Sequence, residues 1–544
     1  MTNDSDREVL KKSPQGSHLL LIAVLLLSAI CFFYGLGRLP FVGADEPRYS
    51  RVAEEMVASG DYVIPHLQGR PWMEKPPLAF WAMAASFHLF GTGEWQARLP
   101  SAVLALSCVL AVYWTGKKLE GEASGLAAAV MLATMSGFFV FARAATTDMP
   151  LAAALTWGFC CWLLACESET ATVRARTLLT LFAAFCFGSA VLAKGLVGAL
   201  FPLAILTTAA LVTRRFQIRP IQLAGALVVF AATALPWHWL AYRRRGFDFI
   251  ATYLINHHFA RYVTELHHHV RPFYFFLLVV IALVAPWTGL LIALFGRKQQ
   301  RLDYRPALLW TWFLFPIFFF SLSTAKLAGY ILPVLPPLAL LLGSALAHRV
   351  VCPPDHAEGR SIRAALLVNA LLVALLAGGL GWAAWHYYRS LAAALPAALS
   401  LLAGAVVLVF YGRSGRLLQA VLSLAFFTAL AVAALVQWFV PVLAIHHSAK
   451  SQVLRAMPLL AEGQVLLLYR YFHHTAPYYS DFRIAEEKLD TLPQLAAYLK
   501  AHPAQRWLVL TTPAGSNELA QMHGYTVGLI RAEGNLVLLA IASR

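Results

Sequence analysis

The chain has 544 residues, of which 59% are hydrophobic and only 13% are charged, and its formal net charge is +16. Soluble domains contain roughly 45–50% apolar residues, so this composition excludes an ordinary soluble protein and indicates a polytopic membrane protein. The positive charge does not indicate nucleic-acid binding, because excess Lys and Arg in a membrane protein first reflects its cytoplasmic loops.

The first apolar segment, residues 18–34, follows a short charged N-terminus. Its length, and the lack of a small-x-small cleavage site after it, distinguish it from a secretory signal peptide. We therefore expect an uncleaved signal anchor whose N-terminus lies in the cytoplasm.

Residues 43–77 form a densely charged stretch in a chain that is otherwise poor in charge. Its charged residues are Asp45, Glu46, Arg48, Arg51, Glu54, Glu55, Asp61, Arg70, Glu74 and Lys75. Carboxylates next to Arg and Lys at a membrane face suit a phosphate-bearing substrate and proton or metal chemistry. The alternative is a solvated loop with ordinary surface charges.

The apolar segment 77–90 has only about 14 residues, which is too few to span a bilayer unaided, so we expect a helix lying at the interface. Twelve longer apolar segments follow, and with residues 18–34 they predict thirteen transmembrane helices. These twelve are residues 99–116, 123–141, 149–166, 177–193, 196–213, 221–241, 272–296, 306–322, 330–347, 363–387, 392–411 and 417–440. The predicted fold is an all-α polytopic membrane domain over residues 1–440, with its first external loop at residues 36–98.

The basic residues of the loops support this topology. With the N-terminus inside, every predicted cytoplasmic loop contains Lys or Arg, and residues 441–544 lie outside the cytoplasm. One external loop, residues 242–271, breaks the rule. Its basic residues are Arg243, Arg244, Arg245, Arg261 and Arg271. An anionic lipid or phosphate partner would explain them, whereas the alternative is that long loops translocate regardless of charge.

The last hundred residues change in character. Residues 463–471 and 506–512 are short strand-like apolar runs, residues 492–501 and 515–523 resemble helices, and residues 525–541 resemble a hairpin. This alternation predicts a small α/β domain over residues 441–544. It contains no Gly-rich phosphate loop and no catalytic constellation, so we expect it to be accessory.

Several polar stretches map to the external face under this topology. They are Asp45-Glu46, Glu74-Lys75, Asp148, Asn256-His257-His258 with Arg261, and Lys326 to Tyr330. Charges at a membrane boundary are costly, so their convergence on one face indicates function. We expect a single external active site.

The residue types narrow the chemistry of this site. Lys75, Arg261 and Lys326 supply cations for a phosphate, and the hydroxyl of Tyr330 is a further donor. Asp45 would act as a general base or stabilise positive charge developing at an anomeric carbon.

A metal site is a second hypothesis for the same face. Glu74, Asp148 and His258 supply carboxylate and imidazole groups of the kind that bind a divalent metal such as zinc, although their spacing in the sequence is wide. The alternative for the histidine is an interfacial polar group. None of the seven cysteines has metal-ligand spacing, and we expect no disulfide framework.

The stretch DEPRYSRVAEEMVASGDYVIPHLQGRPWMEKPPLAFW, residues 45–81, resembles the first external loop of the bacterial aminoarabinose transferases that modify lipid A. These belong to the protein O-mannosyltransferase-like, GT-C group of polyprenyl-phosphate-dependent glycosyltransferases. Further similar segments are TTDMP, AKG at 193–195, ALPWHWLAYRRR, HHFARY and AKLAGYILPVLPPLALLLG. The resemblance covers nearly the full length, although the run Arg243 to Arg245 has no assured match.

The resemblance implies an inverting transferase of the bacterial inner membrane, with a GT-C fold and a periplasmic active site and C-terminal domain. Undecaprenyl phosphate would carry the donor sugar, with 4-amino-4-deoxy-L-arabinose as the leading candidate, and a lipid A phosphate would accept it. By matching motif, Asp45 lies nearest the reacting centre. The phosphate-binding residues would be Arg48, Lys75, Arg261, Lys326 and Tyr330, and the metal or structural polar cluster Glu74, Asp148 and His258. We expect a monomer whose further partners are membrane lipids.

Three alternatives remain. In the first, the enzyme transfers the sugar to a different lipid or to a protein Ser or Thr, as in O-mannosylation. A lipid transporter would show inverted repeats with broken helices in matching halves, and no such repeat is visible in the sequence. A scaffold or receptor is disfavoured, because its loops need no matched set of Lys, Arg and carboxylates.

Overall fold

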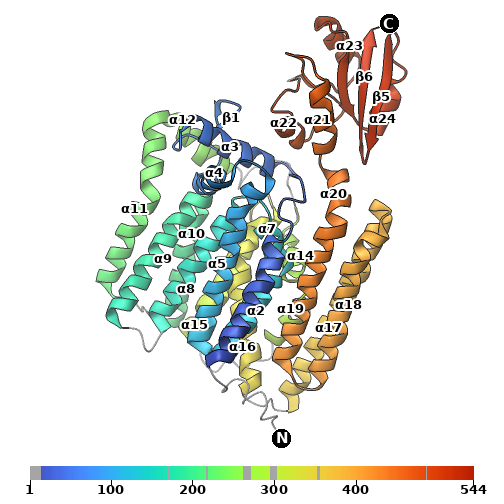
Figure 1. The fold of residues 1–544 in the computed structure, drawn as a ribbon. Helices are drawn as coiled ribbons and strands as arrows, with labels where there is room; N and C mark the ends of the chain where they lie inside the picture. The colour runs from blue at the N-terminus through green and yellow to red at the C-terminus, as the bar shows by residue number, and fades with distance from the viewer. Residues whose placement is uncertain are drawn as a thin grey trace.

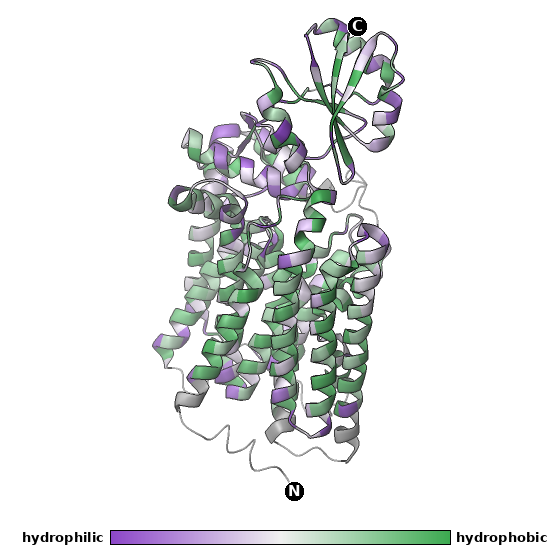
Figure 2. Ribbon diagram, turned by 45° about the vertical axis from the view of Figure 1, so that its right-hand side comes forward, coloured by the Kyte–Doolittle hydropathy of each residue, from purple (hydrophilic) through white to green (hydrophobic). Residues whose placement is uncertain are grey.

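The computed structural model describes residues 14–167, 172–215, 218–260, 271–294, 303–351, 356–485 and 487–543. A bundle of long helices occupies the first four fifths of the chain, and a small mixed domain is attached at one end (Figure 1). Apolar residues dominate the bundle, whereas polar residues gather at the end that faces the small domain (Figure 2). The polar end is where the chain places its first loop.

The first loop contains two helices and a short hairpin. Helix α2 (Pro14–Phe33) precedes it, and the loop itself contains α3 (Asp45–Ser59), β1 (His66–Leu67), β2 (Arg70–Pro71) and α4 (Leu78–Phe90). Glu55 of α3 accepts hydrogen bonds from the backbone amides of Gln68 and Gly69, which ties the hairpin to the helix. The loop is therefore a folded cap on the bundle. Helix α4 occupies the segment for which we expected a short helix.

The helices of the bundle follow. They are α5 (Glu94–Glu120), α6 (Glu122–Thr134), α7 (Ser136–Ala142), α8 (Asp148–Glu167), α9 (Val173–Lys194), α10 (Val197–Thr213), α11 (Pro220–Arg245), α12 (Phe247–Phe249), η1 (Ile250–Ala260), α14 (Phe275–Val284), η2 (Thr288–Leu294), α15 (Tyr304–Ser321), η3 (Ala328–Val334), α16 (Leu335–Val351), α17 (His356–Tyr388), α18 (Leu391–Arg413), α19 (Leu417–Ala434), η4 (Leu435–Phe439) and α20 (Val440–His447). The first predicted span coincides with α2, and each of the other twelve coincides with one helix or with consecutive helices of this series.

Length and composition single out fewer membrane-spanning helices than thirteen. In the described part of the chain, eight helices are long and apolar enough to cross a bilayer, or up to ten if each bent pair is one span. The bends are 63° between α6 and α7 and 105° between α14 and η2. Helix α10 is shorter, and α2 contributes only a short apolar helix, so the count of thirteen stays a prediction.

The C-terminal part has the expected strands, helices and hairpin, and in addition three short helices, α21 (Lys450–Ala456), η5 (Met457–Leu459) and α22 (Thr475–Tyr479), that its pattern did not predict. The expected elements are β3 (Leu467–Tyr469), α23 (Leu492–Ala501), β4 (Trp507–Thr511), α24 (Pro513–Leu519), β5 (Tyr525–Glu533) and β6 (Leu536–Ser543). The four strands form one mixed sheet in the order β3-β4-β6-β5, with β3 and β4 parallel and the other pairs antiparallel. Strand β4 is buried along its whole length, so the centre of the sheet is covered on both faces, whereas the edge strand β5 is largely exposed.

Candidate functional site

Asp45 is the first residue of helix α3 and is partly exposed. Its Oδ1 lies 2.7 Å from Nη2 of Arg48, and Nε of Arg48 also donates to the carbonyl of Ala44 at 3.0 Å. A carboxylate at a helix N-terminus is stabilised by the helix dipole. The side chain of Asp45 is 44% exposed and that of Arg48 28% exposed, so both have surface that a substrate can reach.

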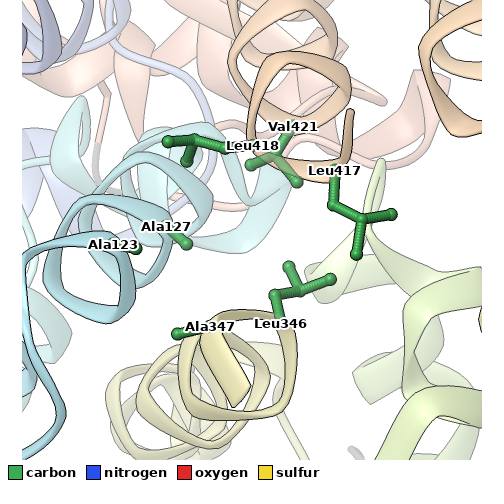
Figure 3. Close-up of a pocket in the computed structure, with 7 residues that line it drawn as sticks. All are labelled: Ala123, Ala127, Leu346, Ala347, Leu417, Leu418 and Val421. Atoms are coloured by element: carbon green, nitrogen blue, oxygen red, sulfur yellow. The ribbon is translucent and has the colours of Figure 1, made fainter. Parts of the chain in front are cut away.

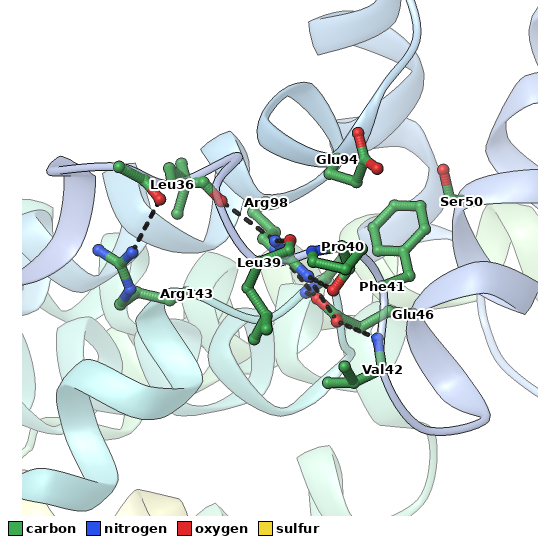
Figure 4. A network of polar contacts seen from close by, with 12 residues as sticks. Leu36, Leu39, Pro40, Phe41, Val42, Glu46, Ser50, Glu94, Arg98 and Arg143 are labelled. Carbon is green, nitrogen blue, oxygen red and sulfur yellow. Dashed lines mark hydrogen bonds and ion pairs between the residues drawn. The ribbon is translucent and has the colours of Figure 1, made fainter. Parts of the chain in front are cut away.

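Glu46, the next residue, points inward and has a different environment. Its carboxylate forms two hydrogen bonds with Arg98 of α5, at 2.7 and 2.8 Å, and accepts the amide of Ala145 at 3.0 Å (Figure 4). Arg98 is almost fully buried and also donates to three carbonyls of the segment after α2, those of Leu36, Leu39 and Pro40. The Asp45-Glu46 pair therefore divides into a surface acid and an internal anchor. Our sequence reasoning did not single out Arg98, although an arginine near the start of a long apolar helix was a visible signal.

A second polar cluster joins three helices below the loop. Asp148 begins α8, and its Oδ1 is ion-paired with Nζ of Lys194 at the end of α9. The same ammonium lies 4.9 Å from the centre of the Tyr330 ring in η3. The structure thus brings together the predicted residues Asp148 and Tyr330, and it adds Lys194, which the sequence signalled only through the AKG segment.

Gly329 makes this approach possible. A Cβ atom at this position would lie 2.7 Å from Cγ of Asp148, which is closer than van der Waals contact permits. Any larger residue would push η3 away from α8. The Tyr330 ring also packs against the ring of Phe320, with the ring centroids 4.8 Å apart.

Lys326 lies in the turn before η3, four residues ahead of Tyr330. It is 5% exposed, and its ammonium donates to the carbonyl of Ser323. Burial lowers the pKa of this lysine, because the charged form loses its hydration. A buried ammonium near the polar end of the bundle is suited to an anionic ligand.

The remaining predicted residues are placed less fully. Glu74 and Lys75 are half-buried between β2 and α4. Arg261 lies outside the described residues, and so does the side chain of His258, whose backbone belongs to η1.

The structure describes the predicted metal set only in part, because the side chain of His258 lies outside the described residues. The ammonium of Lys194 occupies the position beside the Asp148 carboxylate that a cation would need. Among the residues whose side chains are described, no group of three His, Cys, Asp or Glu is arranged to hold a metal ion. Asp148 is therefore an ion-pair partner of Lys194, and the metal site stays a prediction.

A small pocket elsewhere in the bundle is purely apolar. It lies between α6, α16 and α19 and is lined by Ala123, Ala127, Leu346, Ala347, Leu417, Leu418 and Val421 (Figure 3). Helix α5 contacts the first loop at its first turn, and the pocket residues of α6 come just after its last turn, at the opposite end of the bundle. The pocket lacks polar groups and lies away from Asp45, so it is no part of the candidate site.

Comparison with known proteins places this geometry in context. A family model described as dolichyl-phosphate-mannose-protein mannosyltransferase matches residues 74–239. The undecaprenyl phosphate-alpha-4-amino-4-deoxy-L-arabinose arabinosyl transferase 2 of Pseudomonas fluorescens is 31% identical over 355 residues, which are 64% of this chain and 59% of the relative. A similarly named transferase of Pseudomonas aeruginosa is 32% identical over 316 residues, 56% of each chain. The matches thus span less than two thirds of these relatives.

The similarity in structure extends further than the similarity in sequence. The crystal structure of ArnT from Cupriavidus metallidurans in the apo state matches with a TM-score of 0.77 and 25% identity, covering 96% of this chain and 97% of that one. The structure of ArnT bound to undecaprenyl phosphate matches with a TM-score of 0.76 and 24% identity, covering 97% and 98%. An archaeal oligosaccharyltransferase, AglB from Archaeoglobus fulgidus, matches with a TM-score of 0.51. The resemblance to the aminoarabinose transferases and the GT-C fold are confirmed.

Proposed function

We propose that this chain, with the fold of the aminoarabinose transferases, is an inverting glycosyltransferase that uses undecaprenyl phosphate as sugar carrier. The donor sugar would be 4-amino-4-deoxy-L-arabinose and the acceptor a phosphate of lipid A. The observation that carries this proposal is the match to ArnT over nearly the whole of both chains, together with the exposed Asp45–Arg48 pair at the polar end of the bundle.

The reaction needs a nucleophile, a leaving group and charge stabilisation. An oxygen of the acceptor phosphate would attack the anomeric carbon, and the bond from that carbon to the carrier phosphate would break. The carrier would leave as undecaprenyl phosphate with the bonding electron pair. A phosphate acceptor is already an anion, so Asp45 would stabilise the developing positive charge rather than abstract a proton.

The carrier phosphate needs cations at the same end of the bundle. We assign Arg48, Lys75 and Lys326 to this role, with Arg261 and the hydroxyl of Tyr330. Lys194 would act beside them by holding Asp148 and the Tyr330 ring in place.

The topology follows the charge pattern of the loops. We place the N-terminus in the cytoplasm, the catalytic domain over residues 1–440 in the inner membrane, and residues 441–544 in the periplasm. The match of residues 74–239 to the mannosyltransferase model supports a second candidate, transfer to a protein hydroxyl. For that acceptor Asp45 would have to act as a base.

Mass spectrometry of lipid A tests the proposal. Cells with the protein should contain lipid A with an added aminopentose on phosphate, and cells without it, or with Asp45→Asn, should lack this species. Lipid A unchanged by the presence of the wild-type protein would reject the acceptor. Glycosylated envelope proteins in the same cells would then favour the second candidate.

A further inference from the structure

The C-terminal part contacts the first loop through two consecutive tyrosines of α22, Tyr478 and Tyr479. The hydroxyl of Tyr478 donates to Oε1 of Glu54 at 2.6 Å and lies 3.3 Å from the hydroxyl of Ser50, both in α3. Its ring meets Phe41 edge-on, with the centroids 5.0 Å apart. Phe41 and α3 are thus touched by the same side chain.

Tyr479 makes the second attachment. Its hydroxyl donates to Glu94 at 2.9 Å and accepts the backbone amide of Phe41 at 2.8 Å. Lys450 of α21 is ion-paired with Glu94 and lies 5.3 Å from the Tyr479 ring. Glu94 begins α5, so this contact fixes the chain before Asp45 to the bundle.

A third attachment lies at the turn after α22. Arg51 of α3 pairs with Asp481 at 2.9 Å and lies over the ring of Phe482 at 5.1 Å. Asp481 and Phe482 both have positive φ, 50° and 58°, which is unfavourable for residues with a side chain. Such strain persists only where surrounding contacts impose it.

The carboxylates in these contacts are mostly buried. The side chains of Glu54 and Glu94 are 14% and 16% exposed, and burying a carboxylate is costly unless it is paired or hydrogen-bonded. Burial raises the pKa of Glu54, and the hydrogen bond from Tyr478 opposes this rise. The tyrosine hydroxyls therefore satisfy groups that would otherwise destabilise the loop.

Asp45 lies between the two anchored points. Phe41 is four residues before it, and Glu54 is nine residues after it, about 14 Å along the same helix. Tyr478 of α22 contacts α3 directly, and at the start of α22 burial and the charge of Arg48 lower the pKa of His474. Movement of α22 would thus be transmitted to Asp45 from both sides.

We propose that Tyr478 and Tyr479 are positioning residues that hold α3, and with it Asp45 and Arg48, in the reactive arrangement. This inference rests on the proposed function. It gives the C-terminal part, which we expected to be accessory, a positioning role in the transfer reaction.

The test removes each hydroxyl and keeps the ring. Tyr478→Phe and Tyr479→Phe are compared with Tyr498→Phe, a control in α23 whose ring stacks on His502 away from the loop. Purified proteins are assayed for transfer, and hydrogen exchange of the α3 amides is followed by mass spectrometry. We expect each of the two variants to lower kcat about tenfold, as loss of a hydrogen bond to a charged group predicts. KM for the donor should be nearly unchanged, α3 should exchange faster, and the control should match the wild type.

A second pair of variants separates positioning from simple folding. Glu54→Gln keeps an acceptor for Tyr478, so it should lose less turnover than Glu54→Ala. Unchanged kcat in both tyrosine variants, or a lower kcat without faster exchange in α3, would overturn the proposal. Equal losses in the two Glu54 variants would do the same. A wild-type protein that transfers no sugar would instead reject the proposed function, and this role with it.

Discussion

Neutralising the neighbouring carboxylates Asp45 and Glu46 should affect different properties of the protein, transfer activity in the first case and stability in the second. Glu46 is 6% exposed and bound twice by Arg98, whereas the pair of Asp45 with Arg48 is 44% and 28% exposed. Breaking a buried ion pair by removing one charge costs about 3–5 kcal/mol, because the other charge stays buried. Arg98 keeps three carbonyl acceptors, so Glu46→Gln should lower the free energy of unfolding by about 3 kcal/mol. An exposed pair contributes about 0–1 kcal/mol, so Asp45→Asn should barely change it.

Denaturant titration in detergent micelles, followed by tryptophan fluorescence, measures both effects, and a transfer assay at a temperature where both variants are folded measures turnover. We expect Asp45→Asn to lose at least about 10²-fold in transfer with near-normal stability. Glu46→Gln should lose stability first. A Glu46→Gln protein as stable as the wild type, or an Asp45→Asn protein destabilised by a comparable amount, would refute the assignment of one carboxylate to the fold and the other to the reaction.

Three further predictions concern the site and the topology. Lys194→Met should leave the Asp148 carboxylate without its cation, which should lower the stability of the protein and lower transfer about tenfold or more. The double variant Asp148→Asn with Lys194→Met removes the uncompensated charge and should recover stability in the same denaturant titration. Burial by itself would raise the pKa of Glu94, but hydrogen bonds from Lys450 and Tyr479 lower it below its ordinary 4.5. The stability from this contact should therefore be fully present above about pH 4.5 and be lost as the pH falls through the lowered pKa, and Glu94→Gln should reduce this dependence in acid-unfolding curves. Finally, Ser516→Cys should react with a membrane-impermeant thiol reagent in cells with a permeable outer membrane and Ser414→Cys should not; the reverse result would invert the topology.

The long helices were predictable because their apolar stretches are far longer than those of soluble proteins. The bends were not predictable in the same way, since average hydropathy is insensitive to the 63° and 105° changes of direction at α6–α7 and α14–η2. The strands and helices of the C-terminal part matched their patterns closely, as with β4 at Trp507–Thr511 within the predicted run 506–512. Local pattern is a good guide where one face of an element is buried.

The candidate site was only partly predictable. Charge density identified the first loop and the resemblance singled out Asp45, but nothing in the sequence assigned Glu46 to the fold, because that role depends on Arg98, 52 residues away. Lys194 and Asp148 are 46 residues apart, and the metal-site hypothesis did not include this lysine, which forms an ion pair with the Asp148 carboxylate. Partners at such distances become visible only when the helices are packed.

The contacts of α22 with the first loop extend this reasoning. Tyr478 and Glu54 are separated by 424 residues, and no pattern in either segment links them. A reactive acid at a membrane surface must be exposed to its substrate and yet held in one position, two requirements that conflict in a flexible loop. Here Glu46 anchors α3 to the bundle through Arg98, while Tyr478 and Asp481 of the C-terminal part bind α3 at Glu54 and Arg51. Asp45 can remain open to the substrate because its neighbours on the same helix carry the constraints.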